Sequence, residues 1–171
     1  DLLSYRHIPY MDETGQRQVL RSAELVTLSG IPNFNRFQAS ETATVPSSYI
    51  FSAALHPLVE KLRQHGIWVE TLEADSSFSV DVFTVTGIGK QSFVQNGHRN
   101  SLLEGSFANV TRTFSRGDYI VSMNDRLANL IFYLLEPESD DGLAYWNWFD
   151  GLLEPELARV GSVEYPVYKV M

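Results

Sequence analysis

The sequence predicts an α+β domain, in which a small mixed β-sheet is covered by two main helices and preceded by an N-terminal extended or β segment. Three observations predict this class. Short runs of alternating or continuous apolar residues recur along the chain, as strands require. Residues 55–65 and 125–135 carry apolar side chains at helical spacing. Residues 1–47 lack helical periodicity. A β-sandwich with peripheral helices is the alternative architecture for the same elements.

The N-terminal segment is predicted to be extended. Apolar residues flank polar ones over 18–29, which indicates a strand after a turn at 12–15. Proline and two asparagines make residues 31–37 an extended loop. We expect the whole segment 1–47 to add strands along one edge of the sheet.

The chain is expected to be a single domain over 1–171. Residues 48–171 would form its α/β core, and the only soft boundary lies near 40–47. Because the chain opens on Asp1 without an initiator methionine, we expect it to be part of a longer protein.

The clearest helix is predicted over 55–65. Leu55, Leu58, Val59 and Leu62 form its apolar stripe, and Gly66 follows at the left-handed position typical of a helix end. The apolar run at 48–51 precedes this helix, and an alternating segment at 67–72 follows it. A strand, a helix and a strand in this order favour parallel pairing of the two strands.

The middle of the chain is predicted to be β-rich. Residues 78–86 alternate as a strand, and Gly87-Ile88-Gly89-Lys90 is interpreted as a turn that ends it. Asn96-Gly97 is typical of a tight turn between apolar segments. Residues 110–114 and 119–121 are expected to flank a hairpin or tight connection.

The C-terminal part is predicted to contain helices and a final strand. Asn124 or Asp125 is the expected N-cap of the helix that ends before Pro137. Residues 139–141 could cap a short third helix, and residues 165–170 form the last strand. The predicted core contains Ile50, Leu58, Leu62, Val69, Val82, Val85, Ile120, Leu127, Leu130, Ile131, Leu134 and Trp146.

Composition excludes several classes of function. The chain has 171 residues, 44% of them hydrophobic, and a formal net charge of −8 with 21 acidic and 13 basic residues. This balance disfavours nucleic acid as a partner, and no basic patch offsets it. No apolar run reaches the roughly 18 residues of a transmembrane segment. With no cysteine, the chain has no disulfide and no thiolate chemistry.

No motif predicts a catalytic or metal site in this chain. The four histidines, His7, His56, His65 and His98, begin no His-x-x-Glu pair and show no i, i+4 spacing. No Gly-x-Ser-x-Gly sequence is present. We therefore predict no catalytic, cofactor-binding or metal-binding residue. An acidic group made of Glu136, Glu138, Asp140, Asp141 and Asp150 lacks the alternating ligands of a calcium loop and is interpreted as a solvated surface.

An aromatic cluster at 145–149 is the most conspicuous local feature. Large aromatic side chains most often pack in cores or between domains, and they also serve as stacking platforms for sugars or peptides. The possible interface or ligand platform consists of Tyr145, Trp146, Trp148 and Phe149.

The C-terminal segment Leu134–Asp150, followed by Tyr165-Pro166-Val167-Tyr168 near the chain end, resembles the C-terminal region of large bacterial zinc carboxypeptidase-like proteins of the carboxypeptidase A superfamily. In those proteins a leucine-rich helix continues into a similar Glu-Ser-Asp-Asp-Gly-Leu and Trp-Asn-x-Phe-Asp pattern. Further matching segments lie at 33–37, 46–51, 62–67 and 116–121.

The resemblance implies an accessory role. The family binds zinc through a His-x-x-Glu pair and a later histidine and uses a glutamate as general base, and this sequence contains none of these motifs. The resemblance therefore implies that this chain is the non-catalytic C-terminal part of a hydrolase. The parent protein would be a zinc metalloprotease of the carboxypeptidase class, active in proteolysis. Zinc would be bound by the parent protein. The implied partner is the upstream peptidase domain of the same polypeptide, and the implied location is periplasmic or secreted.

Two other functions remain open. The chain could be a glycan- or cell-wall-fragment-binding module that uses Tyr145, Trp146 or Trp148 as platforms. It could also be a small independent hydrolase that uses His98 with acidic partners.

Overall fold

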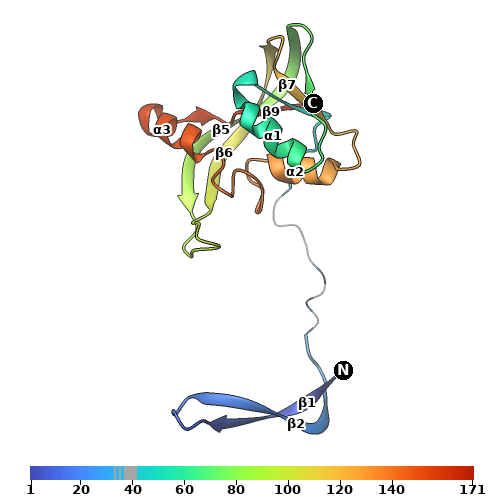
Figure 1. Cartoon of the computed structure of the whole chain (residues 1–171), viewed down its shortest axis with the longest axis vertical. Coiled ribbons are helices and arrows are strands. Elements are labelled where there is room, and N and C mark those ends of the chain that lie inside the picture. The colour runs from blue at the N-terminus through green and yellow to red at the C-terminus, as the bar shows by residue number, and fades with distance from the viewer. Residues whose placement is uncertain (33, 35, 37–41) are drawn as a thin grey trace. The chain divides into compact units, whose positions relative to one another are not determined.

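The computed structural model describes residues 1–32, 34, 36 and 42–171. They form two compact units, Asp1–Ala43 and Thr44–Met171. The fold is mixed and rich in β-structure, with two sheets and short helices among the described residues (Figure 1). The loop predicted at 31–37 lies partly outside these residues.

The first unit contains one antiparallel hairpin, formed by β1 (Leu2–Met11) and β2 (Arg17–Leu28). Strand β2 confirms the strand predicted over 18–29. Asp12 shapes the turn, since its Oδ1 accepts hydrogen bonds from the backbone N–H of Thr14 and of Gln16, each at 2.9 Å. The predicted addition of this segment to the edge of the main sheet is wrong for the described residues, because β1 and β2 pair only with each other.

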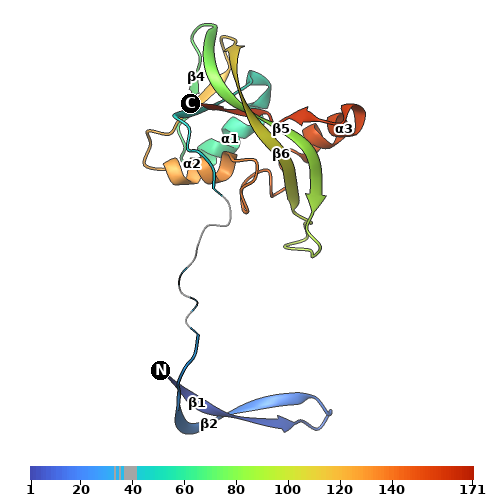
Figure 2. The ribbon, with the colours of Figure 1, turned by 180° about the vertical axis from the view of Figure 1, so that it is seen from behind.

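The second unit is built on one twisted sheet in the order β4-β7-β3-β9-β5-β6 (Figure 2). The strands are β3 (Ser48–Phe51), β4 (Glu70–Thr71), β5 (Ser76–Lys90), β6 (Ser101–Phe114), β7 (Tyr119–Ser122) and β9 (Val167–Val170), and β8 (Val163–Glu164) pairs with β5.

The prediction of a mixed sheet with parallel pairing is wrong. Every pairing between the described strands is antiparallel. The expected βαβ partners β3 and β4 run in the same direction, but β7 lies between them and pairs with both. The connection from β3 through the helix to β4 therefore crosses over β7. Of the strand predicted over 67–72, only Glu70–Thr71 forms a strand.

Strands β5 and β6 form the longest ladder of this sheet. The turn predicted at Gly87–Lys90 is wrong, since these residues continue β5 beyond an irregularity between Val85 and Gly87. The tight turn predicted at Asn96-Gly97 is confirmed, because both residues have positive φ angles, 50° and 83°. The connection after β6 is tight, with Asp118 N–H bonded to the carbonyl of Ser115. It does not form a hairpin, because the next strand pairs with β3 and β4 and not with β6.

Helices cover one face of the sheet (Figures 1 and 2). The 3₁₀ helix η1 (Ala53–Leu55) leads into α1 (His56–Gln64), which confirms the helix predicted over 55–65. Helix α2 (Ala128–Leu135) begins later than the N-cap prediction, although Asp125 does accept a hydrogen bond from Leu127 N–H at 2.7 Å.

The third helix was predicted at the wrong place. Residues 143–149 form turns, and α3 (Asp150–Val160) follows them. Pro155 lies inside α3, in the second turn of the helix, where a proline is unfavourable in isolation. Burial of Leu153 in the core supplies the tertiary contact that outweighs this local preference.

The core of the second unit has two parts. The larger lies between the sheet and the helices and includes Phe51, Leu62, Phe83, Ile131 and Tyr165, and the smaller contains Ile50, Val80, Val82, Phe114 and Val170. The predicted core residues that are buried are Ile50, Leu58, Leu62, Val69, Val82, Val85, Ile131 and Leu134. Those that are only half-buried are Ile120, Leu127, Leu130 and Trp146.

Candidate functional site

The four residues of the predicted aromatic platform have different environments. Tyr145 and Phe149 are buried, and Phe149 packs edge-on against Tyr165 with ring centroids 5.0 Å apart. Trp146 is half-buried and donates its indole N–H to Asp141. Trp148 is 41% exposed. Ligand binding by this cluster stays a prediction, and the side chain most available for it is Trp148.

The five acidic residues predicted as a solvated surface do not form one patch. Glu136 is buried and pairs with Lys169 at 2.9 Å, whereas Asp150 belongs to a separate polar network. Asp140 accepts a hydrogen bond from the Tyr133 hydroxyl. The interpretation as a common surface is therefore wrong, because the chain places these carboxylates against different partners.

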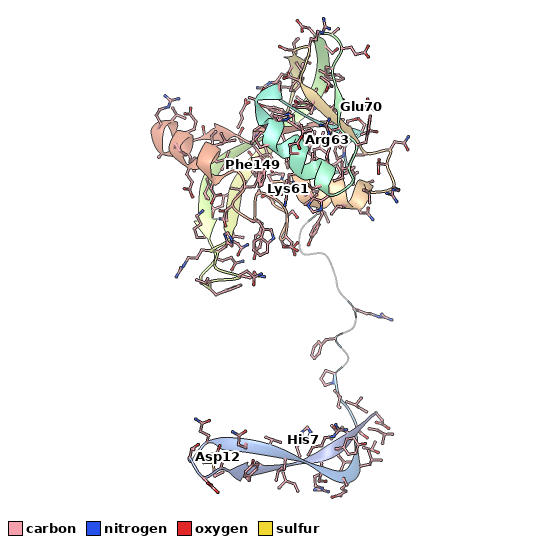
Figure 3. All side chains as sticks on the ribbon, in the orientation of Figure 1. His7, Asp12, Lys61, Arg63, Glu70 and Phe149 are labelled. Carbon is pink, nitrogen blue, oxygen red and sulfur yellow. The ribbon has the colours of Figure 1, made fainter. Side chains whose placement is uncertain are left out.

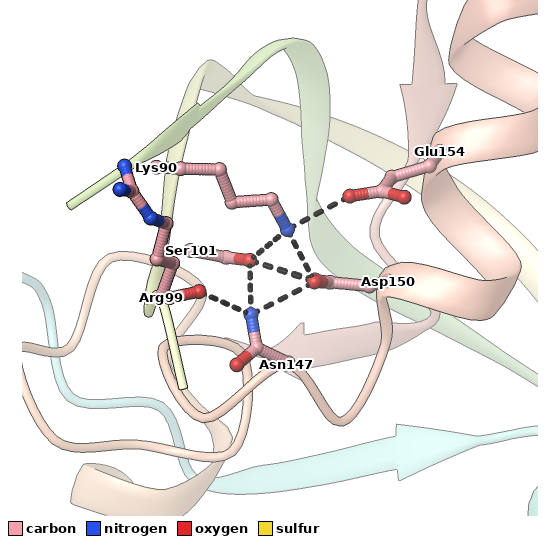
Figure 4. A network of polar contacts seen from close by, with 6 residues as sticks. All are labelled: Lys90, Arg99, Ser101, Asn147, Asp150 and Glu154. Carbon is pink, nitrogen blue, oxygen red and sulfur yellow. Dashed lines mark hydrogen bonds and ion pairs between the residues drawn. The ribbon is translucent and has the colours of Figure 1, made fainter. Parts of the chain in front are cut away.

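The first polar cluster joins the end of β5 and the start of β6 to the start of α3 (Figure 4). Lys90 Nζ lies 2.9 Å from Ser101 Oγ, 2.5 Å from Asp150 Oδ2 and 2.8 Å from Glu154 Oε1. Ser101 Oγ donates to Asp150 Oδ1 at 2.8 Å. We call this group, with Asn147, the Lys90 network.

Asn147 completes the Lys90 network from the turn that precedes α3. Its side-chain amide donates to Ser101 Oγ at 2.8 Å, to Asp150 Oδ2 at 2.9 Å and to the carbonyl of Arg99 at 3.0 Å. Its backbone has a φ of 65°, in the left-handed region that asparagine tolerates better than most residues. This conformation directs the chain into α3 while the amide bridges to β6.

The Lys90 network resembles a serine–lysine pair in composition, but its electrostatics oppose nucleophilic catalysis. Burial alone would lower the pKa of Lys90, yet the hydrogen bonds and charges of Asp150 and Glu154 outweigh it and raise that pKa. A general base must be neutral, and a lysine held protonated cannot accept the serine proton. Ser101 is also only 2% exposed. The hydrogen bonds and the ion pair among Lys90, Ser101 and Asp150 connect β5, β6 and α3 to one another.

The carboxylate of Asp150 is the anionic centre of the Lys90 network. Burial would raise its pKa, but hydrogen bonds from Lys90, Asn147 and Ser101 and the charge of Lys90 lower it overall. Asp150 thus remains ionised at neutral pH while its side chain is largely buried. The sequence does not connect Asp150 with Lys90 and Ser101, because it lies 60 and 49 positions from them.

A second polar cluster is buried between β3, β9 and the end of α2. Glu136 accepts a hydrogen bond from the Tyr49 hydroxyl and pairs with Lys169, and the Lys169 ammonium also lies 4.5 Å from the centroid of the Phe107 ring. Burial, followed by the proximity of Glu136, raises the pKa of Tyr49. The Tyr165 hydroxyl is buried without a hydrogen-bond partner among the described residues. Within this cluster the buried charges of Glu136 and Lys169 compensate each other.

His98, the candidate base of an independent hydrolase, is exposed. Its ring meets the edge of Trp146 at a centroid distance of 6.1 Å, and no carboxylate of the described residues is hydrogen-bonded to it. This arrangement gives no observation in favour of the hydrolase hypothesis. Among residues 1–32, 34, 36 and 42–171, no group of three or more histidine and acidic residues is arranged to hold a metal ion. None of the helices described is long and apolar enough to cross a membrane.

The hairpin of β1 and β2 is the most unusual surface of the molecule. Figure 3 shows side chains on both faces of this hairpin, on which His7 and Asp12 are labelled. No residue of either strand is buried. The large apolar side chains that it exposes are Leu2, Leu3, Tyr5, Ile8, Tyr10, Met11, Val19, Leu20, Leu25 and Leu28.

Exposed apolar residues at this density indicate an interaction surface. An isolated two-stranded hairpin is at best marginally stable in water, and monomeric proteins rarely expose contiguous apolar patches of this extent. The sequence pattern predicts the strand at 18–29 but not the surface, because an apolar pattern does not say whether a second layer covers the strand.

Comparison with known proteins adds no assignment to this geometry. No family description, no curated protein and no solved structure matches the chain.

Proposed function

We propose that this chain is the accessory, non-catalytic C-terminal part of a zinc carboxypeptidase-like protein, and that its hairpin docks on the peptidase domain. The observation that carries this proposal is the hairpin, which exposes large apolar side chains on both faces and buries none. Such a surface is stabilised when another protein layer covers it. The resemblance of residues 134–150 and 165–168 supplies the class of the partner.

The polar clusters of the second unit support a structural rather than a chemical role. Ser101 Oγ accepts hydrogen bonds from Lys90 and Asn147 and donates one to Asp150, so its hydrogen-bonding capacity is used within the network. Glu136 and Lys169 neutralise each other inside the core. In this proposal the reaction, and the zinc ion that it needs, belong to the parent protein.

The test uses the complete reading frame that contains this chain. We expect it to encode a His-x-x-Glu motif and a later histidine before Asp1, and the full polypeptide to release C-terminal residues from peptides. Chelation should abolish this activity and added zinc should restore it. The 171-residue chain alone is the control and should be inert. Peptide hydrolysis by the control, or a reading frame without the zinc motif, would contradict the proposal.

A glycan-binding role is the second candidate, and the exposure of Trp148 favours it. Titration with a soluble peptidoglycan fragment should then change the tryptophan fluorescence. Substitution Trp148→Phe should abolish the change, whereas the matched variant Trp68→Phe should keep it, since Trp68 is 72% exposed and lies outside the aromatic cluster. An unchanged spectrum at millimolar ligand would eliminate this candidate.

A further inference from the structure

The two outer edges of the hairpin are not equivalent. Each edge strand presents a row of backbone groups that are free to pair with another strand. The pairing register runs from Met11 opposite Arg17 to Leu2 opposite Leu28. It determines which backbone groups point inward to the neighbouring strand and which point outward.

The hydrogen bond that closes the turn sets this alternation. Asp12 N–H donates to the carbonyl of Gln16 at 2.9 Å, so residues 12 and 16 form a hydrogen-bonded pair. Hydrogen-bonded and non-hydrogen-bonded pairs alternate along an antiparallel ladder. The pair of Pro9 and Val19 is therefore non-hydrogen-bonded, and the backbone groups of both residues face outward.

Proline at this position weakens the outer edge of β1. Pro9 has no N–H, so β1 lacks one of the donors that an added strand would need in the middle of its length. The same device is a known protection of edge strands against pairing.

The outer edge of β2 has no such interruption. No proline occurs between residues 17 and 28. Arg17, Val19 and Arg21 face outward, and beyond Arg21 the register shifts, so that Ser22, Ala23 and Glu24 lie opposite the single residue Arg6. Over Arg17–Arg21, before this irregularity, β2 therefore offers its outward donors and acceptors without a gap.

The two faces of the hairpin also differ in charge. The ring of Tyr5 lies under Arg21 at 3.7 Å, and the register places His7 and Arg17 on the same face. The other face contains Arg6, which is neutralised by Glu24 through hydrogen bonds of 2.7 and 2.9 Å. Glu24 is the only acidic residue of the two strands, so the first face has cations without a carboxylate.

We infer that the hairpin docks by strand addition along the outer edge of β2, onto an open sheet edge of the peptidase domain whose covering layer places carboxylates over Arg17 and Arg21. This inference rests on the proposed function for the identity of the occupant. Strand addition satisfies the free backbone groups of β2. Because both faces are apolar, the partner must continue the sheet and cover it on each side.

Hydrogen exchange tests the edge directly, with the full polypeptide compared with the 171-residue chain. The outward amides of Arg17, Val19 and Arg21 should exchange roughly tenfold more slowly, or slower still, in the full polypeptide. The outward amides of His7 and Met11 on β1 should not change in this way. The inward amides of Gln18 and Leu20 report separately whether the hairpin is docked at all.

Two proline variants form a matched pair, because each removes an outward N–H and leaves the ladder between β1 and β2 intact. Val19→Pro blocks the edge of β2 and should reduce the protection of the inward amides to the value in the 171-residue chain. Met11→Pro acts on the edge of β1 and should leave that protection unchanged.

Every outcome is decisive. If the inward amides are protected but the outward amides of β2 are not, the hairpin docks through its faces. This result overturns strand addition and leaves the proposed function standing. Unprotected amides of both kinds, or a reading frame without a preceding peptidase domain, overturn both. If the 171-residue chain alone gains the same protection at high concentration with the mass of a dimer, the occupant is a second copy and the inferred occupant is wrong.

Discussion

The hairpin and the unit formed by residues 44–171 are both rich in β-structure, but they differ in what covers their strands. Strand β3 has only four residues, and three of them, Tyr49, Ile50 and Phe51, are at most 1% exposed. Strand β1 has ten residues and buries none. Strand length and hydrogen-bond register are thus properties of the local sequence, whereas burial requires a second layer.

The two regions also differ in how far their ion pairs are buried. The Glu136–Lys169 pair lies in the core of the larger unit, where both side chains are at most 6% exposed, whereas the Arg6–Glu24 pair on the hairpin is more than half exposed. Similar ionic contacts therefore contribute differently to the two regions. The strands of the hairpin are paired, but its side chains lack the burial that stabilises the larger unit.

The largest expected effect is the loss of structure in an isolated peptide of residues 1–43. Its apolar side chains have no covering layer, so we expect no cooperative thermal transition by circular dichroism. Residues 44–171 alone should keep the Tm of the whole chain within about 2 °C, less than a stability change of about 1 kcal/mol produces in a domain of this size. The reason is that both core clusters lie entirely within that unit. A cooperative transition of the peptide would contradict this division.

The next effect concerns the buried ion pair. Glu136→Leu leaves the Lys169 ammonium buried without its carboxylate, and we expect the free energy of unfolding to fall by about 3–5 kcal/mol. The double variant with Lys169→Met should recover most of the loss, since no uncompensated charge remains. Glu60→Ala, which removes the exposed carboxylate next to Arg63 in the same unit, is the surface control and should change it by less than about 1 kcal/mol. Guanidinium denaturation measures all three.

Equal losses for Glu136→Leu and Glu60→Ala would remove the energetic distinction between buried and exposed ion pairs. Failure of the double variant to recover would show that the Tyr49 hydroxyl, left without its acceptor, dominates the cost.

Much of the fold follows from local sequence. The stripe of Leu58, Val59 and Leu62 predicts α1, and the alternation after residue 78 predicts most of β5, because both patterns reflect burial on one face of a regular element. The order of strands does not follow. The insertion of β7 between β3 and β4 depends on contacts between segments distant in the chain, which spacing alone cannot encode.

The polar clusters are not predictable from the sequence for a related reason. Lys169 lies within an apolar strand and Glu136 near an acidic segment, so each one alone is typical of a solvated residue. Only the antiparallel contact of β9 with β3 brings Lys169 next to the end of α2, where burial makes the pair informative. Lys90 and Asp150 are likewise 60 positions apart.

A smaller effect is expected for the Lys90 network. Asp150→Ala removes the acceptor shared by Ser101 and Asn147, and we expect the free energy of unfolding to fall by about 1–3 kcal/mol. Glu154→Gln is the control, with an expected change below about 1 kcal/mol, because the Glu154 side chain is half exposed. Chemical denaturation of the two variants provides the measurement.

The pH dependence of the same variants identifies the cause. The pKa of Asp150 is lowered in the folded protein, so its contribution is complete above the ordinary aspartate pKa of about 3.9. It is lost as the pH falls through the lowered value. Asp150→Ala should therefore lose stability less steeply than the native chain on acidification below that range. Parallel curves would assign the effect to packing instead.

The smallest effect is local and returns to the hairpin. Hydrogen bonds from the Thr14 side chain, the Gln16 backbone and the Gln18 side chain lower the pKa of Asp12 to about 2. This holds only while the turn is formed. If the hairpin docks as proposed, NMR titration of the carboxyl carbon in the full polypeptide should give a midpoint near this value. In the 171-residue chain, the midpoint should rise toward the ordinary value as the turn opens, and Thr14→Ala should raise it in both samples. The turn contributes stability above the ordinary pKa and loses it as the pH falls toward 2. Equal low midpoints in the two samples would mean that the turn persists without a covering layer, and the hairpin would then be a self-sufficient element.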